Sequence, residues 1–248
     1  MITGDHPTTA LSIARELGIA DEADCVLTGQ QLDMLNDHDL GQQVGQVAIY
    51  ARVAAEHKLR VVRALKQAGQ VVAMTGDGVN DAPAVKNADI GIAMGASGSD
   101  VTREAADMVL LDDNFASIVS AVEEGRAIYD NIQKVVHYLL SSNASEILLV
   151  FVAAALGWPA PLLAVQLLWI NLVSDGFPAL ALAIEPPERD VMRRRPHRPH
   201  EPVVTWARGA RILVYGSLMA IAGLVAFAAV YQQDAANLPQ ARTVTFCV

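Results

Sequence analysis

Three apolar segments of membrane length lie in the second half of the chain and restrict its fold more than any other feature. They cover residues 135–156, 162–184 and 212–230, and a helix needs about 20 apolar residues to span a bilayer. Because the bilayer interior supplies no water to backbone N–H and C=O groups, such segments can cross it only as helices. The sequence therefore predicts an α-helical transmembrane domain over residues 135–248. A buried hairpin in a water-soluble protein is the alternative.

The charges around these segments predict their orientation. The loop 185–211 carries seven arginines and four acidic residues, and positively charged loops stay in the cytoplasm. Residues 1–134 lie two crossings earlier, so they are expected on the cytoplasmic side as well. The sequence thus predicts a multi-pass integral membrane protein, placed in the plasma membrane if the source is prokaryotic. A formal net charge of −9 argues against nucleic acid as a partner.

Residues 1–115 differ from the rest, because helical and strand-like patterns alternate along them. Two of the helical patterns end at Gly18 and Gly69, as helices commonly do. Alternation of this kind predicts an α/β domain with a parallel, Rossmann-type sheet. A stalk helix over residues 116–134 is expected to lead from this domain into the first apolar segment. The expected strands are residues 23–27, 47–51, 71–74, 90–93 and 108–111.

The most specific motif is a glycine-rich run at residues 74–83, between a strand-like and a helix-like segment. It reads Met-Thr-Gly-Asp-Gly-Val-Asn-Asp-Ala-Pro. Glycine allows backbone N–H groups to approach an anion closely, and Asp77 and Asp81 offer the hard oxygen ligands that Mg2+ prefers. The run therefore predicts a phosphate and magnesium site. An ordinary glycine turn is the alternative, and Asp81 could also act as an N-cap of the following helix.

Polar residues inside two of the apolar segments point to a second site, because such groups are costly in a membrane and suggest function. Residues three or four apart share one face of a helix. Gly176 and Pro178 are expected to permit local unwinding, which would free backbone carbonyls for ligation. The sequence predicts a site for a hard divalent cation, with hydrogen bonding between helices as the alternative. The expected ligands are Asn143, Glu146, Asn171, Ser174 and Asp175.

The run at residues 74–83 resembles the hinge motif of P-type ATPases, cation pumps that pass through an aspartyl-phosphate. The resemblance implies a haloacid dehalogenase-like fold, with ATP and Mg2+ as cofactors. It implies that Asp77 binds Mg2+, and that Asn80 and Asp81 shape the phosphate site, Asn80 also lying near the phosphoryl oxygens.

Two further segments resemble phosphate-handling motifs of the same family. Residues 3–5 are similar to its Thr-Gly-Asp motif, which implies that Thr3 and Gly4 contact the phosphoryl group and that Asp5 adds polar structure nearby. The segment 51–58 is similar to the one with its phosphate-binding lysine, which implies that Lys58 neutralises phosphoryl charge and that Arg52 helps to hold nucleotide. An N-cap is the alternative for the first motif, and a solvated helix face for Lys58 and Arg52.

The polar membrane segments resemble the fifth and sixth spans of the calcium-type pumps. Ser174 stands where that subfamily has threonine, which preserves the hydroxyl group. The sodium–potassium and proton–potassium pumps carry an acid where this chain has Asn171, so they rank lower. The resemblance implies Ca2+ as the transported cation, although oxygen ligands also suit Mn2+.

The nucleophile of the family is absent from this sequence. No Asp-Lys-Thr-Gly-Thr motif occurs in the 248 residues, so the chain alone is expected to be inactive. The resemblance implies the later half of a phosphorylation domain and spans five to seven of an ATP-driven cation pump, whose expected partners are the lipid bilayer, ATP, a divalent cation and the missing parts of the pump. A membrane-tethered haloacid dehalogenase-type phosphatase and a non-enzymatic binding or regulatory membrane fragment are the alternatives.

Overall fold

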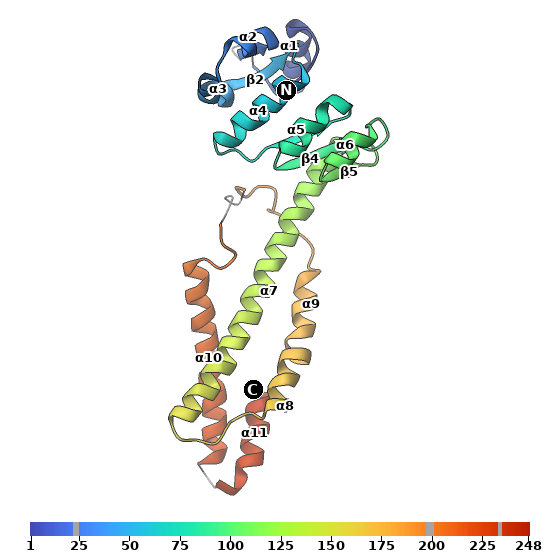
Figure 1. Cartoon of the computed structure of the whole chain (residues 1–248). Helices are drawn as coiled ribbons and strands as arrows, with labels where there is room; N and C mark the ends of the chain where they lie inside the picture. The colour runs from blue at the N-terminus through green and yellow to red at the C-terminus, as the bar shows by residue number, and fades with distance from the viewer. Residues whose placement is uncertain (22–24, 197–200, 233–234) are drawn as a thin grey trace. The chain divides into compact units, whose positions relative to one another are not determined.

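A computed structural model describes residues 1–21, 25–196, 201–232 and 235–248. The chain divides into two compact units, Met1–Val119 and Ser120–Val248, which are described separately (Figure 1).

In the described parts of the chain, the strands all lie in the first unit, where they form two parallel sheets. In the first sheet β1 (Cys25–Thr28) pairs with β2 (Val47–Ala51), and Ile2 adds a single parallel bridge to Tyr50 of β2. The second sheet has the order β3-β4-β5. Its strands are β3 (Ala73–Gly76), β4 (Ile90–Met94) and β5 (Met108–Leu110).

The parallel α/β organisation is as predicted, with the strands divided between two sheets. Among the described residues no strand joins the β2 side of the first sheet to β3 of the second, so β3 has one unpaired edge. The expected strand 23–27 begins at Cys25 in the described part, and residues 23 and 24 lie outside the described residues.

The helices of the first unit follow the predicted pattern with two additions, at residues 37–43 and 100–105. The C-terminal glycines of the two predicted helices have positive φ, +67° at Gly18 and +79° at Gly69, a conformation that favours glycine. An unpredicted helix follows Asn36, whose side chain accepts a hydrogen bond from the backbone N–H of Asp39. The helices are α1 (Pro7–Glu16), α2 (Gly29–Met34), α3 (Asp37–Gln43), α4 (Ala55–Gln67), α5 (Ala82–Asn87) and α6 (Asp100–Ala105).

Helix α4 packs against the cores of both sheets. Val61 and Ala64 belong to one buried cluster with residues of the first sheet, and Val62 belongs to another with Met74 of β3. Burying an apolar side chain of this size contributes about 1.5–3 kcal/mol. These contacts hold α4 beside the glycine-rich turn that follows β3, so the position of Lys58 is set by a helix anchored on two faces.

The second unit is helical. Three helical segments are long and apolar enough to cross a membrane, and the predicted stalk and first span form one uninterrupted helix. The helices are α7 (Ala116–Ala155), α8 (Ala164–Trp169), the π-helical turn η3 (Ile170–Ser174), α9 (Gly176–Ala183), α10 (Trp206–Tyr231) and α11 (Leu238–Cys247).

Small residues allow α10 to approach α7 closely. A Cβ atom on Gly216 would lie 2.9 Å from the Cβ of Ala144, and one on Gly223 would lie 3.2 Å from a methyl carbon of Leu149. Glycine at helix contacts is typical of membrane bundles, where van der Waals packing drives association. Leu149 also packs with Leu162 and Ala220, so the apolar core of this unit joins the helices on either side of the α7–α8 turn.

Candidate functional site

Lys58 of α4 and Asp81 of the turn after β3, both predicted phosphate-site residues, form an ion pair. The Nζ atom of Lys58 lies 2.6 Å from Oδ1 of Asp81, and the two side chains are 21% and 9% exposed. The other carboxylate oxygen of Asp81 accepts a hydrogen bond from the Gly78 N–H at 3.4 Å. Asp81 occupies the N-cap position of α5 but makes no side-chain capping bond there. Its carboxylate therefore binds Lys58 and the Gly78 N–H of the glycine turn instead of capping the helix.

Asp77 and Asn80 remain at the surface of this turn. Both residues are exposed, and the Asp77 carboxylate has no hydrogen-bond partner among the described residues. Gly76 is required here, because a Cβ atom on it would lie 2.6 Å from the Cβ of Asp81. The arrangement leaves one free carboxylate, Asp77, beside a carboxylate that a lysine already neutralises.

A second loop holds the backbone of Asp77 and Gly78 in place. The Ser99 N–H donates to the Asp77 carbonyl at 2.8 Å, and the buried Thr102 hydroxyl donates to the Gly78 carbonyl at 2.8 Å. Asp113 fixes the start of this loop by accepting the N–H groups of Ala96 and Ser97. The hydrogen bond from the Ala96 amide lowers the pKa of Asp113, so this anchor remains charged below the usual range of an aspartate.

We expect Gly98→Ala to destabilise the protein, because the new Cβ would lie 2.0 Å from the Met94 carbonyl oxygen. Overpacking of this kind costs about 1–3 kcal/mol, and the midpoint of thermal unfolding should fall accordingly. Gly41→Ala is the matched control, since nothing lies within 4 Å of its added Cβ and alanine favours a helix interior by about 1 kcal/mol. Equal midpoints for the two variants would contradict the expectation.

The Thr3–Asp5 turn lies against the end of β2. The Thr3 N–H donates to the Tyr50 carbonyl at 2.9 Å, and the Thr3 hydroxyl donates to the Asp5 carboxylate at 2.8 Å. The N-cap of α1 is His6, so the N-cap alternative for this motif is wrong. Among the described residues, no hydrogen bond connects the turn to the Asp77–Asp81 segment. Its role in phosphate binding stays a prediction.

Arg52 lies at a different hollow from Lys58. It lines a polar hollow together with His6, Thr28 and Gln30, and it has a φ of +49°. A positive φ is uncommon for a residue with a side chain and is often found at functional positions. The predicted contact of Arg52 with nucleotide is not tested by this geometry.

The Asp77 side of the site fits a magnesium ion. Mg2+ in phosphoryl-transfer sites uses one or two carboxylates and fills its remaining positions with water and phosphate oxygens. Asp77 supplies one free carboxylate of this kind. In the part of the chain that the structure describes, no group of three His, Cys, Asp or Glu side chains could hold a metal by itself, so the remaining ligands would have to come from substrate and water.

In the second unit, four of the predicted polar residues, Glu146, Asn171, Ser174 and Asp175, lie between α7 and the segment α8–η3–α9. The Asn171 amide donates to Oε2 of Glu146 at 2.8 Å. The hydroxyl of Tyr138 donates to Oδ1 of Asp175 at 3.2 Å, and Asp175 is only 4% exposed. Glu146, Ser174 and Asp175 line the same hollow. Two helices thus deliver two carboxylates to one place.

Two carboxylate oxygens in this hollow have no hydrogen-bond partner among the residues that the structure describes. They are Oε1 of Glu146 and Oδ2 of Asp175, and both are buried. Buried polar atoms are nearly always paired, and an uncompensated charge in an apolar setting is costly. Among the described residues, hydrogen bonding between helices therefore accounts for only one oxygen of each carboxylate. The predicted cation site stays a prediction.

Asn143 is placed apart from the other predicted ligands. Its amide donates to the Leu139 carbonyl of its own helix at 2.9 Å, and its side chain lines an apolar groove beside Trp206. The predicted unwinding at Gly176 and Pro178 is wrong, because both lie within α9. The irregularity is the π-helical turn η3, where the Asp175 N–H donates to the Ile170 carbonyl. Such turns are frequent at functional sites.

Sequence reasoning missed Tyr138 and Thr102. Tyr138 lies eight residues before Glu146 and four after Lys134, so its helical spacing from these polar residues was a usable signal. Thr102 gave no such signal, because its hydroxyl contacts a backbone carbonyl 24 positions earlier in the chain.

Each of the two units matches a known protein family over part of its length. The haloacid dehalogenase-like hydrolase family matches residues 1–89, and the family described as the C-terminus of cation-transporting ATPases matches residues 159–248. The chain is 48% identical over 246 residues to a calcium-transporting ATPase of Bacillus subtilis. The chain belongs to the P-type cation-transporting ATPases. With three membrane-length helices, this member of the family is an integral membrane protein, and the predicted fold class is confirmed.

Other P-type ATPases share the same segment. Calcium-transporting ATPase 1 of Lactococcus lactis is 51% identical over 225 residues, which are 91% of this chain and 26% of that protein. The human calcium-transporting ATPase type 2C member 2 is 41% identical over 246 residues, which are 99% of this chain and 26% of that protein. The match to the Bacillus subtilis protein covers 99% of this chain and 28% of that protein. The chain therefore spans about a quarter of the length of these relatives.

Proposed function

We propose that this chain is part of an ATP-driven pump that moves a divalent cation, most simply Ca2+, out of the cytoplasm. The observation that carries the proposal is the pair of unpartnered carboxylate oxygens on Glu146 and Asp175. Ca2+ binds six to eight oxygens in flexible geometry, and the side chains of Asn171 and Ser174 offer further ones. The calcium-transporting names of the relatives favour Ca2+ over Mn2+.

The first unit would handle the phosphoryl group. Asp77 would hold the magnesium ion, which neutralises charge on the phosphoryl oxygens when bound. Lys58 would stabilise the charge that develops during transfer, and Asp81 would orient Lys58 through their ion pair. We further assign Thr3, Gly4, Asp5 and Asn80 to the phosphoryl group and Arg52 to the nucleotide. The residues of this unit would face the cytoplasm.

The test is calcium-dependent transfer of the γ-phosphate of radiolabelled ATP to the complete gene product that carries this chain. We expect an acid-stable phosphoprotein with Ca2+ and none with a chelator. Asp77→Asn should slow its formation on the order of 100-fold, as loss of one charge-stabilising group does, while Asp39→Asn in α3 should not.

Two other outcomes would overturn the proposal in favour of its alternatives. Hydrolysis of a phosphomonoester that does not require Ca2+ would indicate a membrane-tethered phosphatase. A gene product that forms no phosphoprotein under any cation condition would indicate a binding or regulatory membrane protein.

A further inference from the structure

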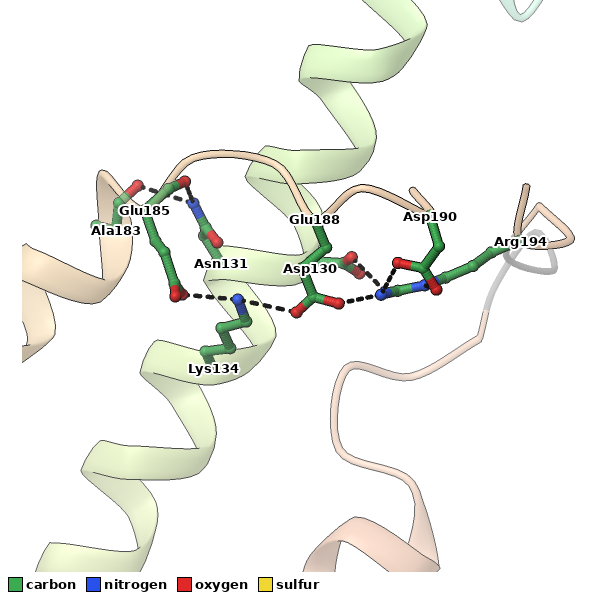
Figure 2. A network of polar contacts seen from close by, with 8 residues as sticks. All are labelled: Asp130, Asn131, Lys134, Ala183, Glu185, Glu188, Asp190 and Arg194. Carbon is green, nitrogen blue, oxygen red and sulfur yellow. Dashed lines mark hydrogen bonds and ion pairs between the residues drawn. The ribbon is translucent and has the colours of Figure 1, made fainter. Parts of the chain in front are cut away.

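A network of charged and polar residues ties the segment after α9 to α7 (Figure 2). Lys134 of α7 contacts Glu185 at 2.7 Å and Glu188 at 3.2 Å. Asp130, also on α7, contacts Arg194 at 2.9 Å. Arg194 in turn contacts Glu188 and Asp190. The network therefore connects one helix to a loop more than fifty residues further along the chain.

Glu188 and Asp190 of the loop have pKa values below their usual range. Hydrogen bonds from Arg194 lower the pKa of Glu188, and Lys134 adds to this effect. A hydrogen bond from Arg194 also lowers the pKa of Asp190. A carboxylate whose folded-state pKa is lowered keeps its stabilising contacts above its usual pKa and loses them only as pH falls further.

Asn131 completes this connection by binding the end of α9. The residue is 6% exposed, and its amide donates to the Glu185 carbonyl at 2.7 Å and to the Ala183 carbonyl at 3.4 Å. The last carbonyls of a helix have no partner within the helix. Asn131 therefore caps the C-terminal end of α9 from a neighbouring helix.

The other end of α9 is also bound to α7. Asp175 immediately precedes α9, and Tyr138 donates to its carboxylate at 3.2 Å and to the Ser174 carbonyl at 3.4 Å. Asn131, Lys134 and Tyr138 are spaced three and four residues apart, so they share one face of α7. They cover about 10 Å of that helix, and α9 is about 12 Å long. Helix α9 is thus attached to one face of α7 at both ends.

We propose that Asn131 and Lys134 are positioning residues that hold α9 in register, so that Asp175 stays opposite Glu146. The inference rests on the proposed function, in which these two carboxylates bind the transported cation. The turn η3 before Asp175 is π-helical and interrupts the regular hydrogen-bond pattern between α8 and α9. A shift of one residue along the helix axis moves Asp175 by about 1.5 Å, which is large compared with the tolerance of a calcium–oxygen distance of 2.3–2.6 Å.

The test uses Asn131→Ala, Lys134→Met and their combination in the complete gene product. The double variant should need about tenfold more Ca2+ for half-maximal phosphorylation, the lower end of the loss seen when groups that orient metal ligands are removed. The maximal level at saturating Ca2+ should stay within about twofold. Lys134→Arg should restore the calcium requirement, because it keeps the charge. Lys66→Met is the matched control, since it removes the ion pair with Asp89 in the other unit.

A distance measurement separates this inference from the proposed function. Spin labels at the exposed positions Ile132 of α7 and Leu180 of α9 report their separation without nucleotide or cation, in a background without other cysteines. The double variant should broaden the distance distribution, and an unchanged distribution would overturn the inference. A calcium requirement within twofold of wild type, or a loss of maximal phosphorylation alone, would also overturn it. Absence of phosphorylation in the wild type would instead contradict the proposed function.

Discussion

Replacing Asp175 by asparagine is expected to weaken the calcium dependence of phosphorylation on the order of 100-fold, the upper range for a disturbed metal site. The same change should stabilise the protein without calcium. One oxygen of this buried carboxylate lacks a partner among the described residues, and asparagine removes the charge, whose burial without compensation is costly. The variant should therefore unfold at a higher temperature than the wild type in a chelator, and calcium should no longer raise its midpoint. Calorimetry of the complete gene product with and without Ca2+ measures both effects.

Weaker calcium dependence together with a higher unfolding midpoint in the chelator would distinguish a binding site from a structural contact. If Asp175 only joined two helices through Tyr138, its removal would lower the unfolding midpoint in the chelator. Tyr138→Phe serves as the matched control, because it removes that hydrogen bond and leaves the carboxylate in place. A lower midpoint for Asp175→Asn together with an unchanged calcium requirement would contradict the expectation.

Replacing Lys58 by methionine is expected to be the most damaging change in the first unit. It leaves the Asp81 carboxylate, whose side chain is 9% exposed, with a single 3.4 Å contact to the Gly78 N–H. Breaking a buried ion pair by removing one partner costs about 3–5 kcal/mol. Phosphorylation should slow by on the order of 100-fold, because the lysine charge that would face the phosphoryl oxygens is lost. Chemical unfolding and single-turnover phosphorylation measure the two losses.

A second substitution separates the stability of this pair from its chemistry. Lys58→Met combined with Asp81→Asn removes both charges, and replacing both partners is often nearly neutral for stability. The double variant should thus regain most of the lost stability while phosphorylation remains slow. Lys66→Met is the control, because the side chains of Lys66 and Asp89 are each 36% exposed and a surface pair contributes at most about 1 kcal/mol. Recovery of phosphorylation in the double variant would refute a chemical role for Lys58.

Much of the local structure followed from the sequence. The apolar segments defined the membrane helices, and Gly18 and Gly69 ended the helices that they were expected to end. The run around Asp77 and Asp81 indicated a turn between a strand and a helix. These features depend on interactions within a few residues, namely side-chain periodicity and backbone preferences, and therefore appear in the sequence.

Other features depended on contacts between distant segments. The division of the parallel strands into two sheets was not visible in the sequence, because strand pairing is decided by which edges meet in space. The expected unwinding at Gly176 and Pro178 became a π-helical turn just before them. Helical periodicity predicted that Asn143 shares the face of Glu146, but its amide donates a hydrogen bond to the Leu139 carbonyl of its own helix.

The sequence by itself determined that this protein has an α/β part followed by membrane-spanning helices, and which carboxylates belong to each candidate site. Only the tertiary structure decided that Lys58 neutralises Asp81, that Glu146 and Asp175 each keep an unpartnered oxygen, and that Asn131 caps α9 from α7. The physical reason is that residue type and spacing fix how one segment folds and which face it presents. Whether a charge on that face is paired, buried or left free depends on the segments that pack against it.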